Sequence, residues 1–308
     1  MNNTNAETGA LSRQESLQQL RQTRRFDLLV VGGGATGLGV ALDAATRGLS
    51  VALVERDDFA KGTSSRATKL VHGGVRYLAQ GNVSLVREAL RERKAALHNA
   101  PHLVQPLPFL MPEFGLKGRL WDRLFYGTGL ILYDLLAGKA GLGNTQFLNR
   151  SETLRALPGV RTEDLVGSVQ YWDGQFDDAR MAVMLARTAA AHGAVVLNHC
   201  PVRALLHVGG KVCGASVTDT ETGEAIDVHA GCVVNATGVW VDELRRMDVD
   251  PQSHMVSPSQ GIHLVVDREF LPGDHALLVP KTDDGRVMFA VPWLGKVLLG
   301  TTDTPRQS

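Results

Sequence analysis

The sequence is poor in cysteine and has no excess of charge of either sign. Its three cysteines in 308 residues, Cys200, Cys213 and Cys232, are odd in number and lie more than four residues apart. This spacing argues against a disulfide framework and against a zinc site, and it is typical of a reducing compartment. Lysine plus arginine number 32, as do aspartate plus glutamate, so no global electrostatic argument favours a nucleic-acid partner.

Long apolar runs are also missing. No stretch of eighteen apolar residues occurs, so we expect no membrane-spanning helix and a chain that is soluble or peripheral to a membrane. The first 25 residues are polar without an apolar core, so they are not expected to be a signal peptide. We interpret residues 1–25 as a polar tail, in which Leu11, Leu17 and Leu20 line only a weak helical stripe.

What is present indicates a folded α/β protein. Hydrophobic residues make up 44% and charged residues 21% of the chain, which excludes wholesale disorder. The length of 308 residues accommodates two domains or one large one. The apolar run 26–31 stops at three glycines, helical spacing follows over 35–47, and a second apolar run, 51–54, ends at Glu55. This order predicts a βαβ unit with two buried parallel strands.

The turn after the first strand has the spacing Gly32-x-Gly34-x-x-Gly37, which is informative because it joins a strand to a helix. The first glycine permits the tight turn, the second lets a pyrophosphate approach the backbone, and the third lets helix and strand pack closely. The helix N-terminus offers N–H donors to phosphates, and Glu55 can accept both ribose hydroxyls. The predicted nucleotide contacts here are Gly32, Gly33, Gly34, Ala35, Thr36, Gly37, Glu55 and Arg56.

A second region decides between NAD and FAD. Three short alternating strands, over 202–207, 212–218 and 225–229, form a predicted meander, and a buried strand over 232–235 follows. Flavoproteins with two dinucleotide-binding motifs have this meander, whereas simple NAD dehydrogenases lack it, so FAD is favoured. In such proteins a small-residue turn passes the cofactor phosphates and a backbone segment reaches the adenine edge. The matching residues are Ala236, Thr237 and Gly238 for the turn and Val202 for the adenine edge.

The segment 62–77 carries further candidates for the cofactor and the reaction. Three consecutive hydroxyl residues can donate to flavin phosphates, and a glycine pair lets the backbone pass close to a planar ring. Three cations can lie beside a redox centre at which negative charge develops. The hydroxyl residues are Thr63, Ser64 and Ser65, and the glycine pair is Gly73 and Gly74. The cations are Lys69, His72 and Arg76, and the neighbouring Leu70 and Tyr77 are further candidates.

The segment 62–77, with 26–55 before it, resembles the family of FAD-dependent glycerol-3-phosphate dehydrogenases, the respiratory enzymes of glycerol catabolism. Stretches 171–180, 235–240, 261–266 and 300–304 match later blocks of that family in the same order. The resemblance implies oxidation of sn-glycerol 3-phosphate to dihydroxyacetone phosphate, with electrons passing through FAD to a membrane quinone. It also implies a cytoplasmic protein, peripheral on the inner face of the cell membrane. No nucleic acid is expected as a partner, and a homodimer is left open.

The reaction requires a base near the C2 hydroxyl of the substrate. We expect His263 in this role, because the family places the matching histidine on the substrate side of the flavin, although a hydrogen-bond donor or a structural histidine are open alternatives. Arg76 is the candidate phosphate ligand, since a guanidinium binds phosphate oxygens in pairs, and Tyr77 adds a hydroxyl. His72 completes the predicted catalytic set.

The expected architecture is an α/β protein with a Rossmann-like FAD domain of the two-dinucleotide-binding type and an antiparallel-sheet substrate domain. We assign residues 26–110 and 178–250 to the FAD domain and residues 111–177 and 251–308 to the substrate domain. The four prolines at 101, 106, 108 and 112 are expected to break regular structure, and the β-rich last fifty residues to form a sheet. The apolar segment 118–138 is either a helix packed within the protein or an element in contact with lipid headgroups.

Two other functions remain open at this stage. One is an amine or 2-hydroxyacid oxidoreductase of the same flavoprotein group, and the other is a catalytically inactive FAD-binding module. The family continues beyond the block that matches 300–304, with further basic substrate ligands, a return segment and a helical C-terminal region. None of these lies within the 308 residues, so we expect the sequence to be a fragment of a longer chain.

Overall fold

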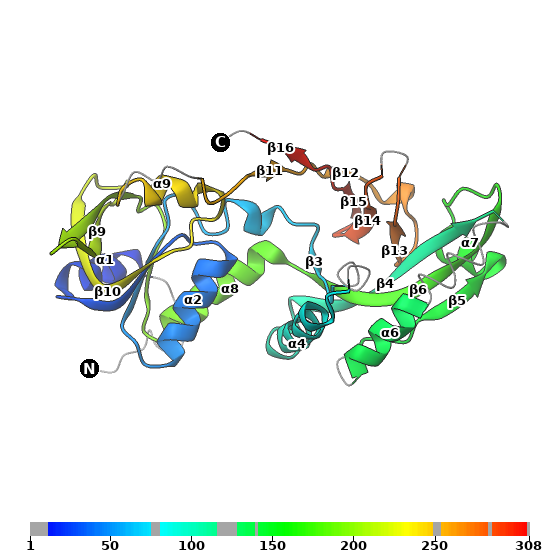
Figure 1. Ribbon diagram of the computed structural model, residues 1–308, viewed down its shortest axis with the longest axis horizontal. Coiled ribbons are helices and arrows are strands. Elements are labelled where there is room, and N and C mark those ends of the chain that lie inside the picture. Colours follow the sequence, from blue (N-terminus) through cyan, green and yellow to red (C-terminus); the bar gives the residue numbers. More distant parts are fainter. Residues whose placement is uncertain are drawn as a thin grey trace. The chain divides into compact units, whose positions relative to one another are not determined.

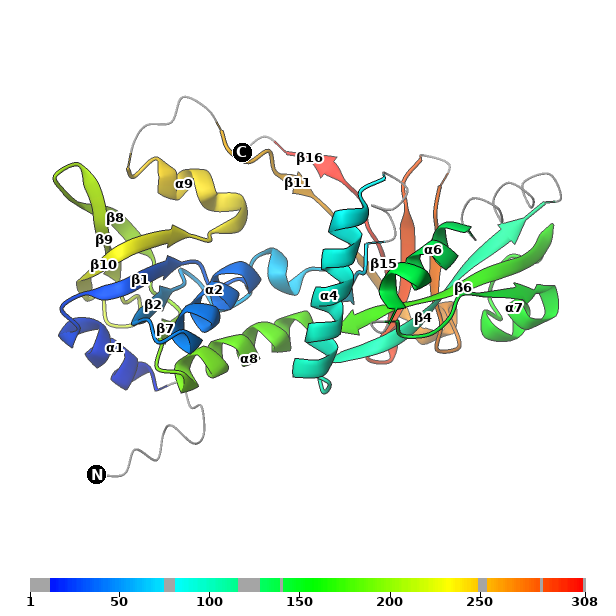
Figure 2. The same ribbon diagram turned by 60° about the horizontal axis from the view of Figure 1, so that its bottom comes forward.

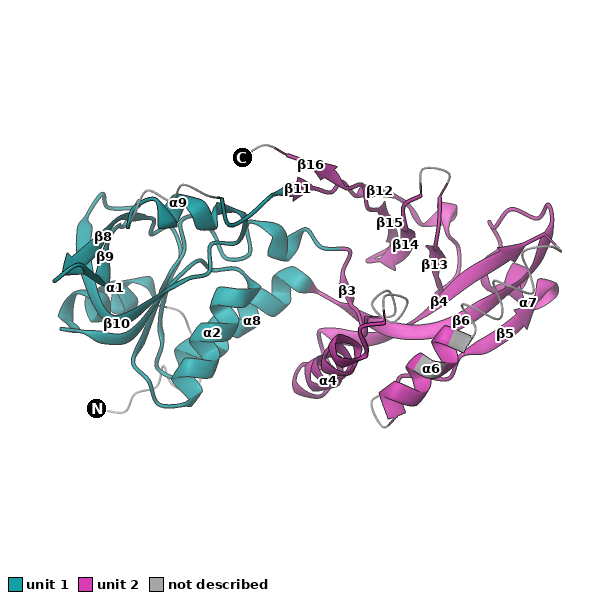
Figure 3. Ribbon diagram, viewed as in Figure 1, with its two compact units in different colours: residues 1–67, 178–258, 307–308 teal, residues 68–177, 259–306 magenta. Residues whose placement is uncertain are grey.

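The computed structural model describes residues 12–74, 81–115, 128–138, 141–248, 254–282 and 285–306. The chain divides into two compact units, which Figure 3 shows in separate colours. Unit 1 consists of residues 1–67, 178–258 and 307–308, and unit 2 of residues 68–177 and 259–306. Figure 1 labels their helices and strands.

Unit 1 contains a six-stranded sheet in the order β7-β2-β1-β10-β9-β8. Its strands are β1 (Phe26–Val31), β2 (Val51–Val54), β7 (Val195–Leu197), β8 (Val202–Val208), β9 (Lys211–Thr218) and β10 (Ala225–Asn235). The predicted βαβ unit is confirmed, since β1 and β2 pair in parallel. The two strands predicted over 225–229 and 232–235 form one strand, β10, which pairs antiparallel with β9 and then parallel with β1.

Helices cover both faces of this sheet. On one face α2 (Ala35–Thr46) and α8 (Asp178–Ala191) lie side by side, as Figure 2 shows, and their alanines form a closely packed core with β1 and β2. On the other face α1 (Arg13–Gln22) and the short helix α9 (Val241–Arg245) each contribute leucine to a second core. The 3-10 helices η1 (Thr63–Ser65) and η4 (Gly238–Trp240) also belong to this unit.

The N-terminal segment corrects one prediction. Residues 1–25 are not tail throughout, because α1 begins after the N-cap Ser12, whose hydroxyl accepts the Glu15 N–H. Leu17 and Leu20 are buried against the sheet. Two leucines on a weak helical stripe are therefore enough to form this helix, because their burial against the sheet stabilises a helix that intrinsic propensity alone would not stabilise.

Unit 2 is built on an eight-stranded sheet in the order β12-β15-β14-β13-β4-β6-β3, with β5 pairing with β6. These strands are β3 (Leu70–Val71), β4 (Val104–Phe114), β5 (Gln146–Asn149), β6 (Leu165–Phe176), β12 (Leu264–Asp267), β13 (Ala276–Val279), β14 (Met288–Trp293) and β15 (Lys296–Gly300). A separate two-stranded sheet joins β11 (Ser259–Gln260) to β16 (Thr304–Pro305). The β-rich end of the chain is thus confirmed.

The remaining elements of unit 2 are helices. The longest of them is α4 (Val83–Asn99), and α6 (Thr128–Ala137) packs against it through Tyr133. The helix α7 (Arg150–Ala156) and the 3-10 helix η5 (Arg268–Phe270) complete the unit. Of the segment 118–138, only residues from 128 on are described, so its predicted lipid contact is untested. Among the helices that the structure describes, none is long and apolar enough to cross a membrane.

The prolines of β4 correct a second prediction. Pro106, Pro108 and Pro112 do not break regular structure but lie within this eleven-residue strand. All three occupy even-numbered positions, so their missing N–H groups fall on the same edge of the strand. The other edge keeps its donors, and β4 pairs with β6 along its whole length.

The domain boundary lies earlier in the chain than expected. The sequence placed residues 68–110 in the FAD domain, but they belong to unit 2. The physical reason is strand pairing, because β3 and β4 both pair with β6 in the second sheet. The chain returns to unit 1 at residue 178, which is the residue where the FAD domain was expected to resume. Unit 1 then extends to residue 258 rather than 250. The predicted fold class, an α/β protein with a Rossmann-like domain and a mostly antiparallel second sheet, is confirmed.

Candidate cofactor and substrate site

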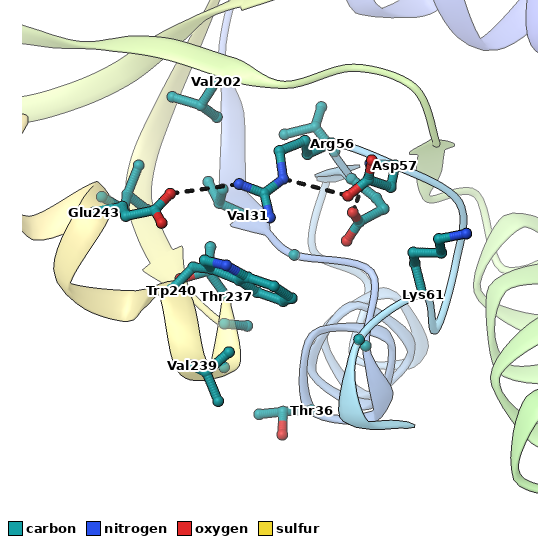
Figure 4. A pocket seen from close by; sticks show the side chains of 18 of the residues that line it. Val31, Thr36, Arg56, Asp57, Lys61, Val202, Thr237, Val239, Trp240 and Glu243 are labelled. Atoms are coloured by element: carbon teal, nitrogen blue, oxygen red, sulfur yellow. Dashed lines mark hydrogen bonds and ion pairs between the residues drawn. The ribbon is translucent and has the colours of Figure 1, made fainter. Parts of the chain in front are cut away.

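A pocket of about 490 Å³ opens in unit 1 at the carboxyl ends of β1, β2 and β10. Ligands of parallel α/β sheets bind at this edge, outside the ends of the strands. Figure 4 shows the side chains around it, including Val31, Thr36 and Val202. The predicted contacts that line it are Gly32, Gly34, Ala35, Thr36, Glu55, Arg56, Thr63, Ser64, Val202, Ala236, Thr237 and Gly238.

The glycine turn has no room for side chains at two positions. Gly32 has φ +115°, and a Cβ on it would lie 2.4 Å from the carbonyl oxygen of Ala236. A Cβ on Gly37 would lie 1.9 Å from the carbonyl oxygen of Gly32 itself. The turn, α2 and the end of β10 therefore approach at backbone distance, which is the cradle that a pyrophosphate needs.

Glu55 lies at the end of β2, fixed by two backbone donors. Its Oε2 accepts the Gly33 N–H at 2.6 Å, and its Oε1 accepts the Asp57 N–H at 2.8 Å. Gly33 therefore lies behind the pocket wall and orients the carboxylate. The fixed Glu55 carboxylate is in the position where a ribose hydroxyl would donate to it.

The hydroxyl residues of η1 divide into two roles. Ser64 Oγ accepts the Ala35 N–H at 2.9 Å, which places this hydroxyl at the N-terminus of α2, and Thr63 lines the pocket beside it. Ser65 Oγ instead donates to the carbonyl of Ala60 at 2.7 Å, and Ser65 is not among the lining residues. Ser64 and Thr63 can therefore meet a phosphate, whereas Ser65 stabilises the loop.

The sequence analysis did not identify the aromatic wall of this pocket. The Arg56 guanidinium lies 4.7 Å from the centre of the Trp240 ring and forms ion pairs with Asp57 at 3.3 Å and Glu243 at 3.4 Å (Figure 4). Trp240 follows the Ala236–Gly238 turn, and a Cβ on Gly62 would lie 3.1 Å from its ring. Arg56 was itself a predicted contact, whereas the signal for Trp240 was its position two residues after the predicted Ala236–Gly238 turn.

The remaining predicted cofactor contacts lie in unit 2. Lys69 has φ +64°, and its carbonyl accepts the Phe176 N–H at 2.9 Å. Leu70 is buried in the core of unit 2, so only its backbone is available to a ligand. Gly73 and Gly74 are also buried. Their contact with the cofactor stays a prediction.

His263 has a fixed position in unit 2. Its Nε2 is hydrogen-bonded to Thr68 Oγ1 at 2.9 Å, and a Cβ on Gly300 would lie 2.4 Å from its ring. The imidazole is half-buried against the end of β15. A hydroxyl partner on one nitrogen and a glycine backbone along the ring hold it in one orientation, as a proton-transferring group requires.

Gly73 and His72 lie beside a buried ion pair that the sequence analysis missed. Asp173 Oδ1 accepts N–H groups from Arg93 at 2.9 Å and from Gly73 at 3.0 Å, while its Oδ2 lies 3.6 Å from His72 Nδ1. Arg93 also donates to Tyr133 Oη at 2.8 Å. Arg93, Asp173 and Tyr133 are each 1–2% exposed.

One signal could have revealed this network. Arg93 occupies a position in line with Val86 and Leu90 on the buried stripe of α4, where an arginine needs a buried partner. Burial and the neighbouring Asp173 charge raise the pKa of Tyr133, so its hydroxyl stays protonated. Arg76 and Tyr77, the predicted phosphate ligands, lie outside the described residues.

Comparison with known proteins agrees with this geometry. Residues 27–308 match the family described as DAO, FAD dependent oxidoreductase. The chain therefore belongs to the family of FAD-dependent oxidoreductases, and its cofactor is FAD. The pocket of unit 1 fits that cofactor, because the backbone cradle at Gly32, the α2 N-terminus and the Glu55 carboxylate are the partners of a dinucleotide.

Particular relatives narrow the resemblance. The chain is 46% identical over 96% of its length to "Glycerol-3-phosphate dehydrogenase, mitochondrial" of Bos taurus and covers 42% of that protein. The relative of the same name from Saccharomyces cerevisiae is 43% identical and is covered to 50%. The glycerol-3-phosphate dehydrogenase from Bacillus halodurans, solved with FAD, superposes with a TM-score of 0.77 at 36% identity, over 97% of this chain and 51% of that one. The chain thus spans about half the length of these relatives.

Proposed function

We propose that the protein oxidises sn-glycerol 3-phosphate to dihydroxyacetone phosphate in glycerol catabolism. The observation that carries the proposal is the 46% identity to a glycerol-3-phosphate dehydrogenase over almost the whole chain. FAD, when bound, supplies the acceptor for the hydride that leaves C2 of the substrate. A quinone then takes the electrons, so each turnover converts one alcohol to a ketone and one quinone to a quinol.

The residues of this chain take separate parts in the proposed reaction. His263, oriented by Thr68, takes the proton of the C2 hydroxyl as the C–H bond breaks. Arg76 and Tyr77 bind the substrate phosphate, and a guanidinium suits that task because it makes paired, charge-assisted hydrogen bonds. His72, next to the buried Asp173, places a further imidazole beside the glycine pair.

The test is anaerobic reduction of the purified yellow protein. Addition of sn-glycerol 3-phosphate is expected to bleach the flavin absorbance, whereas glycine and lactate leave it unchanged. His263→Ala is expected to lower turnover by roughly 10²–10⁴-fold, the usual loss when a general base is removed, at unchanged FAD content. His229→Ala, at an exposed position on β10, is the matched control and keeps full turnover. Bleaching by an amino or hydroxy acid instead would overturn the substrate, and normal turnover of His263→Ala would remove this residue from the mechanism.

The proposal also covers the electron acceptor, the cellular location and the oligomeric state of the protein. We place the protein on the cytoplasmic surface of the cell membrane, as a peripheral protein that delivers electrons to quinone and has no nucleic-acid partner. Reduction of a soluble quinone analogue by substrate, faster than reduction of oxygen, tests the acceptor. Co-sedimentation with anionic lipid vesicles tests the membrane surface, and light scattering tests a homodimer.

A further inference from the structure

Helix α1 precedes the region that matches the family, yet its first residue, Arg13, contacts distant residues of unit 1, among them a buried aspartate. The Arg13 guanidinium donates from Nη1 to the carbonyl oxygen of Asn198 at 2.8 Å and to its Oδ1 at 3.1 Å. From Nη2 it donates to Asp219, whose side chain is fully buried. Its Nε lies 3.1 Å from a Glu221 carboxylate oxygen. One side chain of α1 therefore joins two loops of unit 1.

The first of these loops leads directly into the pocket wall. Asn198 follows β7, and its Nδ2 donates to Asp58 Oδ1 at 2.9 Å in the loop after β2. The Cys200 N–H donates to the Glu55 carbonyl at 2.7 Å, so the two loops run side by side. Cys200, Pro201 and Val202 then line the pocket. Arg13 therefore binds Asn198, the residue at which this wall segment begins.

The second loop contacts the same wall at His199. Asp219 lies at the end of β9, where it also accepts the Thr222 hydroxyl and the Glu221 N–H. The next residue, Thr220, donates both its N–H and its hydroxyl to the carbonyl of His199, each at 3.0 Å. His199 has φ +50°, in the left-handed region, and the two bonds from Thr220 to its carbonyl hold it there.

The place of the wall along the cofactor follows from the dinucleotide geometry. The pyrophosphate of a bound FAD would lie at the α2 N-terminus and its adenosine ribose at Glu55. The segment 200–202 lies beyond Glu55, so it faces the adenosine end of FAD. A wall that already has its bound conformation binds tighter, because no ordering is required when the ligand arrives.

We propose that Arg13 is a positioning residue for FAD: helix α1 fixes the wall 198–202 in the conformation that accepts the adenosine end, without touching the cofactor. This role concerns the cofactor alone and does not depend on which substrate the enzyme oxidises. A purely structural helix would change the stability of the protein and leave the intrinsic affinity for FAD unchanged.

The test uses two arginines of the same helix. Arg13→Ala cuts the bonds to Asn198 and Asp219, whereas Arg21→Ala cuts only an exposed pair with Glu224, which lies in the same turn region as Asp219. The dissociation constant for FAD is measured on the full-length protein by flavin fluorescence, together with the melting temperature of the apoprotein. Arg13→Ala is expected to raise the dissociation constant at least fivefold. Arg21→Ala is expected to change it less than twofold.

Two milder variants cover the case in which Arg13→Ala fails to fold. Arg13→Lys keeps a charge near Asp219 but lacks the planar fork that also reaches Asn198. Asn198→Ala leaves the Arg13–Asp219 pair intact and removes the side-chain bonds to Arg13 and Asp58. Both are expected to raise the dissociation constant twofold to fivefold at a nearly unchanged melting temperature. Wild-type affinity in these two variants, or an equal loss in Arg21→Ala, would overturn the proposal.

Discussion

At the scale of single residues, backbone sterics at the glycine turn set the strongest requirement. Gly32 combines a positive φ with a Cβ site 2.4 Å from a carbonyl oxygen. For Gly32→Ala we expect the free energy of unfolding to fall by at least ~1–2 kcal/mol, because an alanine in a left-handed conformation costs about that much before the clash is counted. We also expect the dissociation constant for FAD to rise about tenfold or more. Urea unfolding and flavin titration measure both quantities.

Gly39 provides the control for that substitution. It lies in the interior of α2, and a Cβ there would meet nothing within 4 Å. Gly39→Ala is expected to raise the free energy of unfolding by ~0.5–1 kcal/mol, the usual gain from alanine in a helix interior, with FAD binding unchanged. If the two variants behaved alike, the steric argument for Gly32 would be wrong.

A second residue-scale prediction concerns thiol chemistry. Burial raises the pKa of the Cys200 thiol to about 11, with Asp219 adding a smaller contribution in the same direction. Because the thiolate is the nucleophile, Cys200 is expected to resist a thiol reagent at pH 8 while the exposed Cys232 reacts. Mass spectrometry of the labelled folded protein separates the two sites. Fast labelling of Cys200 at pH 8 would contradict the prediction.

At the scale of elements, the ion pair between α4 and β6 is the most consequential contact. Arg93 and Asp173 are both buried, and Asp173 also accepts the Gly73 and Gly174 N–H groups. Arg93→Ala is expected to lower the free energy of unfolding by ~3–5 kcal/mol, because it leaves a buried carboxylate without its charge partner. Arg91→Ala, at an exposed pair with Glu92 on the same helix, should change it by less than ~0.5 kcal/mol. Denaturant unfolding of both variants makes the comparison, and similar losses would argue against a special role for the buried pair.

The elements also show where sequence reasoning succeeded. The βαβ unit was predictable because hydrophobic periodicity and glycine spacing are local properties, and so was most of the pocket that forms at its carboxyl edge. The helix α1 was not, since the burial of Leu17 depends on a sheet surface made by distant residues. The strand β4 was missed because its three prolines lack N–H donors on one edge only, so the other edge keeps its donors, and the pairing with β6 is not visible in the sequence.

At the scale of the whole molecule, assembly from separated segments hid part of the site from the sequence. The boundary at residue 67 and the Arg93–Asp173 pair both depend on pairing between residues far apart in the chain. His263 was identified through family resemblance, but His263 and its two partners, Thr68 and Gly300, come from three separate segments. Spacing within one motif cannot predict such contacts.

The whole molecule should also respond to its cofactor. A ligand that binds only the folded state stabilises it by RT ln(1 + [L]/Kd), or ~2.7 kcal/mol at a hundredfold excess over Kd. Added FAD is therefore expected to raise the melting temperature of the apoprotein in a concentration-dependent way, and added FMN, which lacks the adenosine that the unit 1 pocket would bind, is expected to raise it much less. Calorimetry measures the melting temperature with each flavin. Equal increases with FAD and FMN would mean that most of the binding energy comes from contacts outside this pocket.

The pairing of β1 with β10 has a consequence for biosynthesis. Phe26 is aligned with Ala230, about 200 residues later in the chain, so a nascent polypeptide exposes one side of β1 long before its neighbour leaves the ribosome. During that interval unit 2, whose strands β4 and β6 pair within residues 104–176, can begin to form first. The pairing of β1 is thus completed late, and interrupted translation would leave an open apolar sheet edge that chaperones must shield.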